Sequence, residues 1–556
     1  MLEPALLALA LVLGDYEEPP PAEKLSTVAL DDYQFAQVQR VDVSDGRTKV
    51  SVENNAPSPL AGTFPVRVFI DNSLGPAGPV ELSFRANAQG FHLVRRTVEL
   101  RAGERRVVDL PAFAEMRYGT VSASGAGTRP GAGSVYFQSV TSPNKVVLTL
   151  SRPETFEHFI GKAPNYAGGS VQVLAIPVDE APAELASYAG YDAVILPEAG
   201  TLEALDEGPL RALEAYAATG GALIIEGPLR SNKTLPLLAR TNAGWHPYAF
   251  GQVTIHEGQG LDPASLRQEF PVNPHGPVPE YERRYGTARL DALLPQATAP
   301  LGRFLLIILV FTVLIGPGSL LVARRRGAAA LLVTIPLTAF LTCAAIIGYS
   351  LAADGFTVHA SSYGLTWLDA KAHRAINLGV TGYYANLSPP NAVFPAMTVV
   401  VPAHEERREH FSADLSWSEG LTLGSDFIPS RVYREWGLLS VEPTRARLVV
   451  KQQAGAWVVQ NALGHELRSL LVNVDGKQLR TGALRDGGEA VLELAAAGAS
   501  LNVKLDRFSS QAVPKVGTLP PGQFLAELTG TGFLPTGGVV TQLHDGQHWV
   551  RGTFEP

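Results

Sequence analysis

Two glutamates stand at the ends of predicted strands, where carboxylates are well placed for chemistry. The apolar run YDAVILP precedes Glu198, and the apolar run ALII precedes Glu226. An open sheet of parallel strands places its ligand sites at the carboxyl ends of those strands. Together with Pro197 and Gly227, the two acids therefore define a candidate ligand pocket with two carboxylates. The alternative interpretation is that both acids face solvent at an edge that binds nothing.

The other patterns that would support catalysis or metal binding are incomplete. His404 and His410 share a charged segment but are six residues apart. Two histidines that bind one zinc ion from a helix are spaced four apart, and Arg408 occupies that position. We interpret the segment as a charged turn, and His246 and His256 show no ligand spacing. Neither G-x-S-x-G nor the phosphate-binding G-x-x-x-x-G-K-[ST] occurs. We therefore expect no catalytic residue, no metal site and no cofactor.

The strands that would position the two acids belong to a chain of several units. Residues 27–150 read as short strands separated by Gly and Pro turns, which is typical of a β-sandwich. Residues 151–295 alternate strands with a helix over Leu202–Thr219, which predicts a parallel sheet. Residues 356–438 return to strands and turns as a β-rich region, and 439–556 form a C-terminal β domain.

Two long uncharged stretches separate the early units from the late ones. Phe304–Ala323 has 20 residues and Gly327–Ala353 has 27. At about 1.5 Å rise per residue, about 20 residues cross the roughly 30 Å of a hydrocarbon core. We therefore predict a two-helix transmembrane hairpin over 304–353. Its bend contains three consecutive basic residues, which determine the topology: Arg324, Arg325 and Arg326.

A short loop rich in arginine stays on the cytoplasmic side of a membrane. The expected location is thus the inner (cytoplasmic) membrane, with two spans and with the N- and C-terminal domains extracytoplasmic. The aromatic residues Trp367, Tyr383 and Tyr384 follow the second span. They form either an interfacial belt or the core of the next strands.

Residues 1–26 are expected to be a signal-like segment followed by a Pro-rich linker. Ala5–Gly14 is apolar but too short to span a bilayer, which is typical of a secretory signal. Glu3 precedes it and no basic residue does. Either the start lies elsewhere or export depends on the first span. The single cysteine, Cys343, falls in the second predicted span, which excludes a disulfide framework and cysteine-based zinc or iron–sulfur sites.

The composition excludes two further classes of protein. The chain of 556 residues is 46% hydrophobic and 18% charged, which is too apolar for a disordered protein. Its formal net charge is −8, and basic patches with interleaved aromatic residues are missing. Nucleic-acid binding is therefore not expected.

The segment YDAVILPEAGTLEALDEGPLRALEAYAATGGALIIEGP resembles the class I glutamine amidotransferase-like, flavodoxin-like fold. The hairpin IGPGSLLVARRRGAAALLVTIP and the following SSYGLTWLDAKAHRA are similar to a poorly characterised family of bacterial membrane proteins. That resemblance implies an outer β domain, a degenerate amidotransferase-like domain and a membrane hairpin. Active amidotransferases carry a nucleophilic cysteine at a strand end where this chain has Glu226. A carboxylate cannot replace a thiolate nucleophile, so the resemblance implies no glutaminase activity.

The expected fold class is therefore multidomain: an N-terminal β-sandwich, an α/β flavodoxin-like domain, a two-helix transmembrane hairpin and C-terminal β-rich domains. The favoured function is a non-catalytic envelope protein that acts as a scaffold or accessory subunit. Its expected partners are the lipid bilayer and a protein of the envelope. One alternative is an accessory subunit of a transport system, packed against a multi-span protein at Gly316 and Gly318. The other is an enzyme or ligand sensor that uses the pocket near Glu198 and Glu226.

Overall fold

The fold was examined in a computed structural model of the chain. The structure describes the following ranges: 33–59, 62–87, 90, 92–140, 145–160, 171–229, 234–238, 243–257, 293–294, 301–354, 357–402, 412–495 and 519–555. The expected signal-like segment 1–26 and the segment from His404 to His410 lie outside these ranges.

Two facing sheets contain most of the N-terminal strands, and three strands from after the hairpin extend the second sheet. The first, in order, contains β2 (Gln39–Asp45), β3 (Lys49–Asn54), β5 (Thr63–Asp71) and β8 (Arg105–Phe113). The second, in order, contains β10 (Gly131–Tyr136), β9 (Tyr118–Gly125), β6 (Gly78–Ala86), β7 (His92–Leu100), β22 (Ala413–Trp417), β23 (Gly420–Leu423) and β20 (Ala392–Pro395). Strand β6 alternates buried and exposed residues, because one face of its sheet packs on the core. The short strands β4 (Pro57–Ser58) and β11 (Gln138–Ser139) pair beside these sheets.

A sheet of mostly parallel strands packs against this part. Its order is β1 (Tyr33–Phe35), β13 (Val171–Ile176), β12 (Lys145–Leu150), β14 (Ala193–Leu196), β15 (Ala222–Glu226), β17 (Gly251–His256) and β16 (Gly244–Tyr248), with β16 antiparallel. Strands β1 and β12 precede residue 151, so this sheet draws on chain from the expected sandwich range. Every residue of β12 is buried, as in a central strand covered on both faces.

The helix expected over Leu202–Thr219 is divided in the structure. Helix α3 (Thr201–Ala204) ends where Leu205 turns extended, with ψ 142°, and α4 (Glu207–Ala218) begins two residues later. Pro209 explains the break, since a proline inside a helix clashes with the carbonyl four residues earlier, here that of Leu205. The parallel sheet also carries α2 (Pro153–Ile160) and the 3-10 turns η1 (Val178–Glu180) and η2 (Leu185–Ser187).

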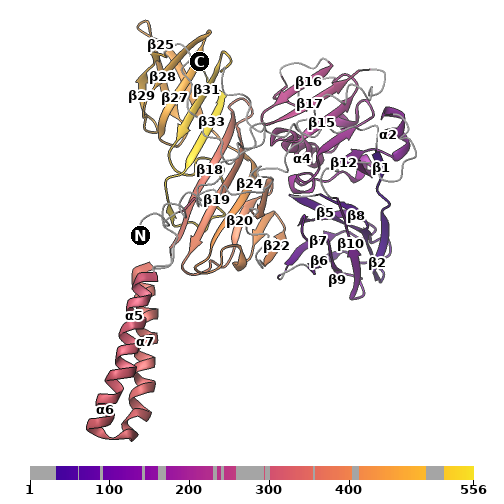
Figure 1. The fold of residues 1–556 in the computed structure, drawn as a ribbon. Coiled ribbons are helices and arrows are strands. Elements are labelled where there is room, and N and C mark those ends of the chain that lie inside the picture. The colour runs from indigo at the N-terminus through magenta and orange to yellow at the C-terminus, as the bar shows by residue number, and fades with distance from the viewer. Residues whose placement is uncertain are drawn as a thin grey trace, which may run out of the picture.

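Two helices are long and apolar enough to cross a membrane. The first runs through α5 (Leu301–Val313), a π-helical turn at Leu314–Gly318 and α6 (Ser319–Arg326). The π turn contains Pro317, which has no N–H for the helical ladder. After the 3-10 turn Ala328–Ala330, α7 (Leu331–Asp354) returns alongside. In Figure 1 the pair projects from the rest of the chain, and the parts before and after it lie at its open end.

The chain after the hairpin forms a large sheet and a small one. In order, the large sheet contains β21 (Thr398–Pro402), β24 (Tyr433–Pro443), β19 (Arg374–Ala385), β18 (Val358–Asp369), β33 (Gln547–Thr553), β31 (Gln523–Leu528), β27 (Leu467–Val474), β28 (Lys477–Thr481) and β30 (Glu493–Leu494), and β32 (Gln542–Leu543) pairs with β18. The small sheet contains β25 (Arg447–Gln453), β26 (Ala456–Ala462) and β29 (Glu489–Val491). The 3-10 turn η6 (Ser425–Phe427) precedes β24.

The aromatic residues after the second helix belong mainly to the protein interior. Tyr383 is fully buried and stacks edge-on against Phe427 at a centroid distance of 5.1 Å. Trp367 contacts Phe250 of the parallel-sheet part at 6.4 Å. The core interpretation of Trp367 and Tyr383 is therefore the one that the structure supports.

Candidate functional site

The structure brings the expected pocket residues to neighbouring strand ends. Leu196 of β14 pairs with Ile225 of β15. The next residues, Pro197 and Glu226, therefore lie at the carboxyl ends of two neighbouring strands. The loops touch, since a Cβ atom on Gly227 would lie 2.5 Å from the Cβ of Ala199. Gly227 also has φ +87°, a conformation that favours glycine. This close contact leaves little space between the two loops.

The exposure of these residues differs. Pro197 and Gly227 are buried, Glu226 is half-buried and Glu198 is exposed. The Gly227 N–H donates to the carbonyl of His256 at 2.5 Å. Glu198 therefore faces solvent, whereas Glu226 is only partly accessible to solvent.

Sequence reasoning missed His256 at this edge. Glu226 pairs with His256 across β15 and β17. The His256 ring packs edge-on against Phe159 of α2 at 6.3 Å, and burial lowers its imidazole pKa. Strand register therefore places a carboxylate and an imidazole at neighbouring positions on this edge of the sheet. The only signal in the sequence is that each residue ends an apolar run. Since β16 lies between β15 and β17 along the chain, the sequence does not show that these two strands pair.

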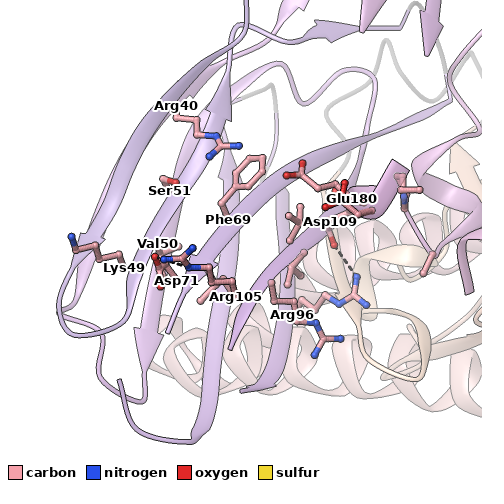
Figure 2. Close-up of a pocket in the computed structure, with 18 of the residues that line it drawn as sticks. Arg40, Lys49, Val50, Ser51, Phe69, Asp71, Arg96, Arg105, Asp109 and Glu180 are labelled. Carbon is pink, nitrogen blue, oxygen red and sulfur yellow. Dashed lines mark hydrogen bonds and ion pairs between the residues drawn. The ribbon is translucent and has the colours of Figure 1, made fainter. Parts of the chain in front are cut away.

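A cleft of about 880 Å³ lies elsewhere, between the four-stranded sheet and the segment after β13 (Figure 2). One wall is formed by β2, β3, β5 and β8, and the other by Asp179–Glu184. Its lining includes five basic and six acidic side chains: Arg40, Lys49, Arg96, Arg105, Arg106, Asp42, Asp71, Asp109, Asp179, Glu180 and Glu184. Both signs are present in similar number, so the cleft has no single electrostatic preference.

Next to the cleft lies a buried arginine that contacts two of its lining residues, Asp109 and Glu180. Arg67 of β5 is 1% exposed, and its Nη2 donates to the carbonyl oxygen of Glu180 at 2.8 Å. Its Nε lies 3.5 Å from the Asp109 carboxylate, and Nη2 lies 3.5 Å from the Glu180 carboxylate. Arg67 thus ties the four-stranded sheet to the segment that leaves the parallel sheet.

Burial raises the pKa of Asp109 to about 7. The cause is removal of its carboxylate from water, which the positive charge of Arg67 opposes and the nearby Glu184 reinforces. Burial raises the pKa of Glu53 in the same way, again against the effect of Arg67. Asp109, which lines the cleft, and Glu53, which lies near Arg67, therefore hold protons more tightly than they would in water.

Some of the remaining cleft charges have partners within the protein. Arg96 donates to the Glu184 carboxylate at 2.6 Å and to the carbonyl of Asp109 at 2.9 Å. The guanidinium of Arg40 lies 3.7 Å from the ring centre of Phe69, a cation–π contact. These contacts indicate that residues lining the cleft hold two parts of the protein together.

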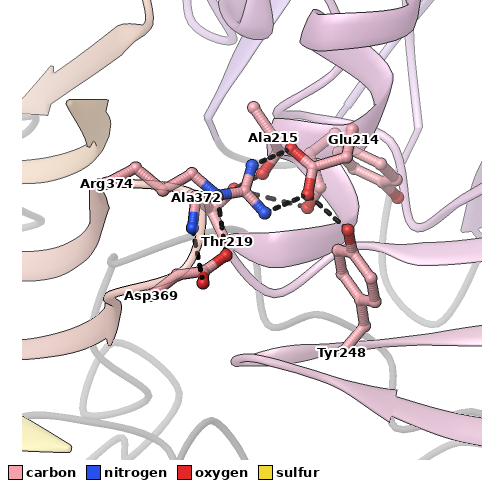
Figure 3. A network of polar contacts seen from close by, with 8 residues as sticks. Glu214, Ala215, Thr219, Tyr248, Asp369, Ala372 and Arg374 are labelled. Atoms are coloured by element: carbon pink, nitrogen blue, oxygen red, sulfur yellow. Dashed lines mark hydrogen bonds and ion pairs between the residues drawn. The ribbon is translucent and has the colours of Figure 1, made fainter. Parts of the chain in front are cut away.

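A second polar network joins the parallel-sheet part to the chain after the hairpin (Figure 3). Arg374 of β19 donates through Nη1 and Nη2 to the two carboxylate oxygens of Glu214 on α4, at 2.5 and 2.8 Å. Its Nε donates to Asp369 at 3.2 Å. The Tyr248 hydroxyl also donates to Glu214, and burial together with that carboxylate raises the tyrosine pKa. This network, which we call the latch, joins the half-buried Arg374 to the buried Glu214.

The basic residues of the hairpin lie at its far end. Arg324, Arg325 and Arg326 occupy the last turn of α6, and Arg325 and Arg326 are exposed. In the described part of the chain, no group of three or more His, Cys, Asp or Glu side chains is arranged to hold a metal ion.

Comparison with known proteins adds no argument about function. No protein-family model matches the chain, and no curated protein matches it. One similar structure is a Paenibacillus sp. cycloisomaltooligosaccharide glucanotransferase complexed with cycloisomaltoheptaose, with 14% identity and a TM-score of 0.13 over 34% of this chain and 28% of that one. Another is the yeast delta-COP-I mu-homology domain complexed with a Dsl1 WxWxV peptide, with 10% identity and a TM-score of 0.15 over 36% of this chain and 96% of that one. Such TM-scores do not define a shared fold.

Proposed function

We propose that this chain is a non-catalytic envelope protein, anchored by a hairpin in the inner membrane, that presents one rigid set of interaction domains outside the cytoplasm. The proposal depends mainly on one observation: chain from before the hairpin and chain from after it form a single body. Strand β22 pairs with β7, in parallel, within one sheet. A rigid body at one end of a membrane hairpin is suited to displaying surfaces to partners.

Several contacts reinforce that joint. Arg95 donates to both carboxylate oxygens of Asp414, at 2.8 and 2.6 Å. The Trp417 indole donates to the carbonyl of Pro111 at 3.1 Å. One continuous hydrophobic cluster runs from the N-terminal sheets through the parallel sheet to Trp436 of β24. Ion pairs, hydrogen bonds and a shared core all oppose separation of the parts.

The strand order supports a flavodoxin-like, degenerate amidotransferase-like domain within this proposal. The order β13, β12, β14, β15, β17 corresponds to the 2-1-3-4-5 order of flavodoxin-like sheets. At the end of β15 stands Glu226, where an amidotransferase would need a cysteine nucleophile. The domain in this proposal serves recognition.

Fusions along the hairpin test the membrane topology. Alkaline phosphatase fused after Asp354 is expected to be active, because it follows two spans. The same enzyme fused after Arg326 is expected to be inactive, whereas green fluorescent protein at that position fluoresces. The reverse pattern would place the bend outside the cytoplasm and overturn the proposed localisation.

A pair of variants tests the non-catalytic role in a strain that depends on the protein. The double variant Glu198→Gln, Glu226→Gln is expected to support growth, since neither carboxylate does chemistry in this proposal. Arg374→Ala, which opens the latch, is expected to fail. Loss of function in the double variant, with normal folding and abundance, would favour an enzyme or sensor at the strand ends.

A role as accessory subunit of a transport system is the second candidate. A Cβ atom added to Gly316 would meet nothing within 4 Å, so this small-residue position is open to a neighbouring helix. Purification in mild detergent is expected to retain a multi-span protein, and Gly316→Leu is expected to release it. Recovery of the chain alone from both forms would argue against this candidate.

A further inference from the structure

Three exposed apolar side chains gather at one end of the large sheet. Leu387 is 55% exposed, Leu543 is 53% exposed and Val432 is 37% exposed. Water contacts each of them, although apolar surface is more stable away from water. Their common position in the sheet distinguishes them from scattered surface residues.

Strand register places all three near the first rungs of the sheet. Val358, the first residue of β18, pairs with Ala385, the last residue of β19, and Leu387 follows two residues later. Tyr433 begins β24 opposite Tyr384, and Val432 immediately precedes it. On the other side of β18, Leu543 pairs with Ala360. The three side chains thus belong to strands that start or end together.

This end of the sheet adjoins the hairpin. Helix α7 ends at Asp354, and β18 begins at Val358. Four residues of extended chain reach at most about 14 Å. The headgroup layer of one leaflet is about 5–8 Å thick, so the sheet end lies close to the membrane surface if α7 spans the bilayer. Figure 1 shows the open end of the hairpin next to this end of β18 and β19.

We propose that Leu387, Val432 and Leu543 form a membrane-contact rim that inserts into the lipid headgroup region beside the hairpin. This inference rests on the proposed membrane span. The occupant is the bilayer because the rim is continuous with the spanning helix, within the reach of four residues. The rim supplies further points of contact beside the hairpin, which fixes the angle of the extracytoplasmic body to the membrane.

Cysteine labelling tests the rim, since Cys343 is the single cysteine of the chain. In a Cys343→Ser background, Leu387→Cys and Leu543→Cys each receive an environment-sensitive fluorophore. Leu494→Cys is the matched control, because Leu494 is 72% exposed on β30, away from the hairpin. All are reconstituted in phosphatidylcholine–phosphatidylglycerol vesicles that carry a nitroxide quencher near the headgroups.

The labels at 387 and 543 are expected to shift to the blue and to lose fluorescence to the lipid quencher, whereas the label at 494 is not. The wild-type protein labelled at Cys343 reports on the hairpin separately, with a quencher deep in the acyl chains. Quenching at 343 without quenching at 387 and 543 would overturn the rim and leave the span intact. A blue shift at 387 without lipid quenching would mean that protein covers the patch, which also overturns the proposal. An unquenched label at 343 would overturn the span itself.

Discussion

An arginine joins the parallel-sheet part to its neighbour at each of two seams, but the half-buried Arg374 and the buried Arg67 differ in their hydrogen bonds. Arg374 uses Nη1, Nη2 and Nε in hydrogen bonds to Glu214 and Asp369. Arg67 donates from Nη2 alone, its ion-pair distances are 3.5 Å, and its Nε and Nη1 make no hydrogen bond within the described residues. We call the fully hydrogen-bonded seam at Arg374 the closed seam, and the seam at Arg67, which adjoins the cleft, the open seam. Burial of a charge does not by itself stabilise a joint between two parts of a protein. The polar atoms of that charge must also be hydrogen-bonded.

The largest effect is expected at the closed seam. Arg374→Ala leaves the Glu214 carboxylate buried with Tyr248 as its remaining hydrogen-bond donor of the network, which should lower the free energy of unfolding by about 3–5 kcal/mol. Chemical denaturation of the detergent-solubilised protein measures this. The matched control is Arg211→Ala on the same helix, whose ion pair with Glu207 is exposed and contributes about 0–1 kcal/mol. Equal losses in the two variants would refute the latch.

A smaller effect is expected at the open seam. Arg67→Met keeps most of the side-chain volume and removes a guanidinium that is incompletely hydrogen-bonded. The Asp109 carboxyl, with its raised pKa, then takes up a proton instead of remaining as an unpaired charge. We expect a loss of about 1–3 kcal/mol in the same denaturation assay. A loss larger than that of Arg374→Ala would reverse the comparison.

The pH dependence of the open seam follows from Asp109. Its pKa is about 7 in the folded protein, above its ordinary value of 3.8. The folded state therefore binds this proton more tightly, and the resulting stability is complete below pH 3.8 and lost as pH rises to about 7. Asp109→Asn should flatten the fall in stability between pH 4 and 7. Denaturation curves across that range for both proteins measure the difference, and parallel curves would contradict the assignment.

The smallest effect is expected at the mouth of the cleft. Arg105 and Asp71 form an exposed ion pair at 3.2 Å. Arg105→Ala should change stability by no more than about 0.5 kcal/mol, because water screens both charges. A shift in denaturation midpoint as large as that of Arg67→Met would show that this exposed ion pair stabilises the open seam as much as Arg67 does.

Local pattern predicted single strands better than it predicted partners. The short strands expected within residues 27–150 include β5, and the apolar run before Glu226 is β15, because alternation and short apolar runs are visible within a few residues. The two long apolar helices were also predictable, since that prediction depends only on length and the lack of charge. The place of β12 in the parallel sheet was not, since a short apolar run does not reveal which sheet it joins.

The candidate site shows the same limit. Sequence placed Pro197, Glu198, Glu226 and Gly227 at strand ends, and the structure brings their loops into contact. That they bind a ligand stays a prediction. The Arg374–Glu214 pair joins residues 160 positions apart, and nothing local marks either side chain as buried. Arg67, likewise, sits in a strand whose charged residue would ordinarily point to solvent.

The pairing of β7 with β22 has a consequence for biogenesis. Arg95 and Asp414 are 319 residues apart, and both long apolar helices are made between them. While the ribosome is still producing the hairpin, β7 has a bare edge with unmatched amide and carbonyl groups, the kind of edge that seeds aggregation. The early half therefore cannot complete its fold until the second half has been made. A nascent chain stalled before the second half emerges should depend on holdase chaperones to stay soluble.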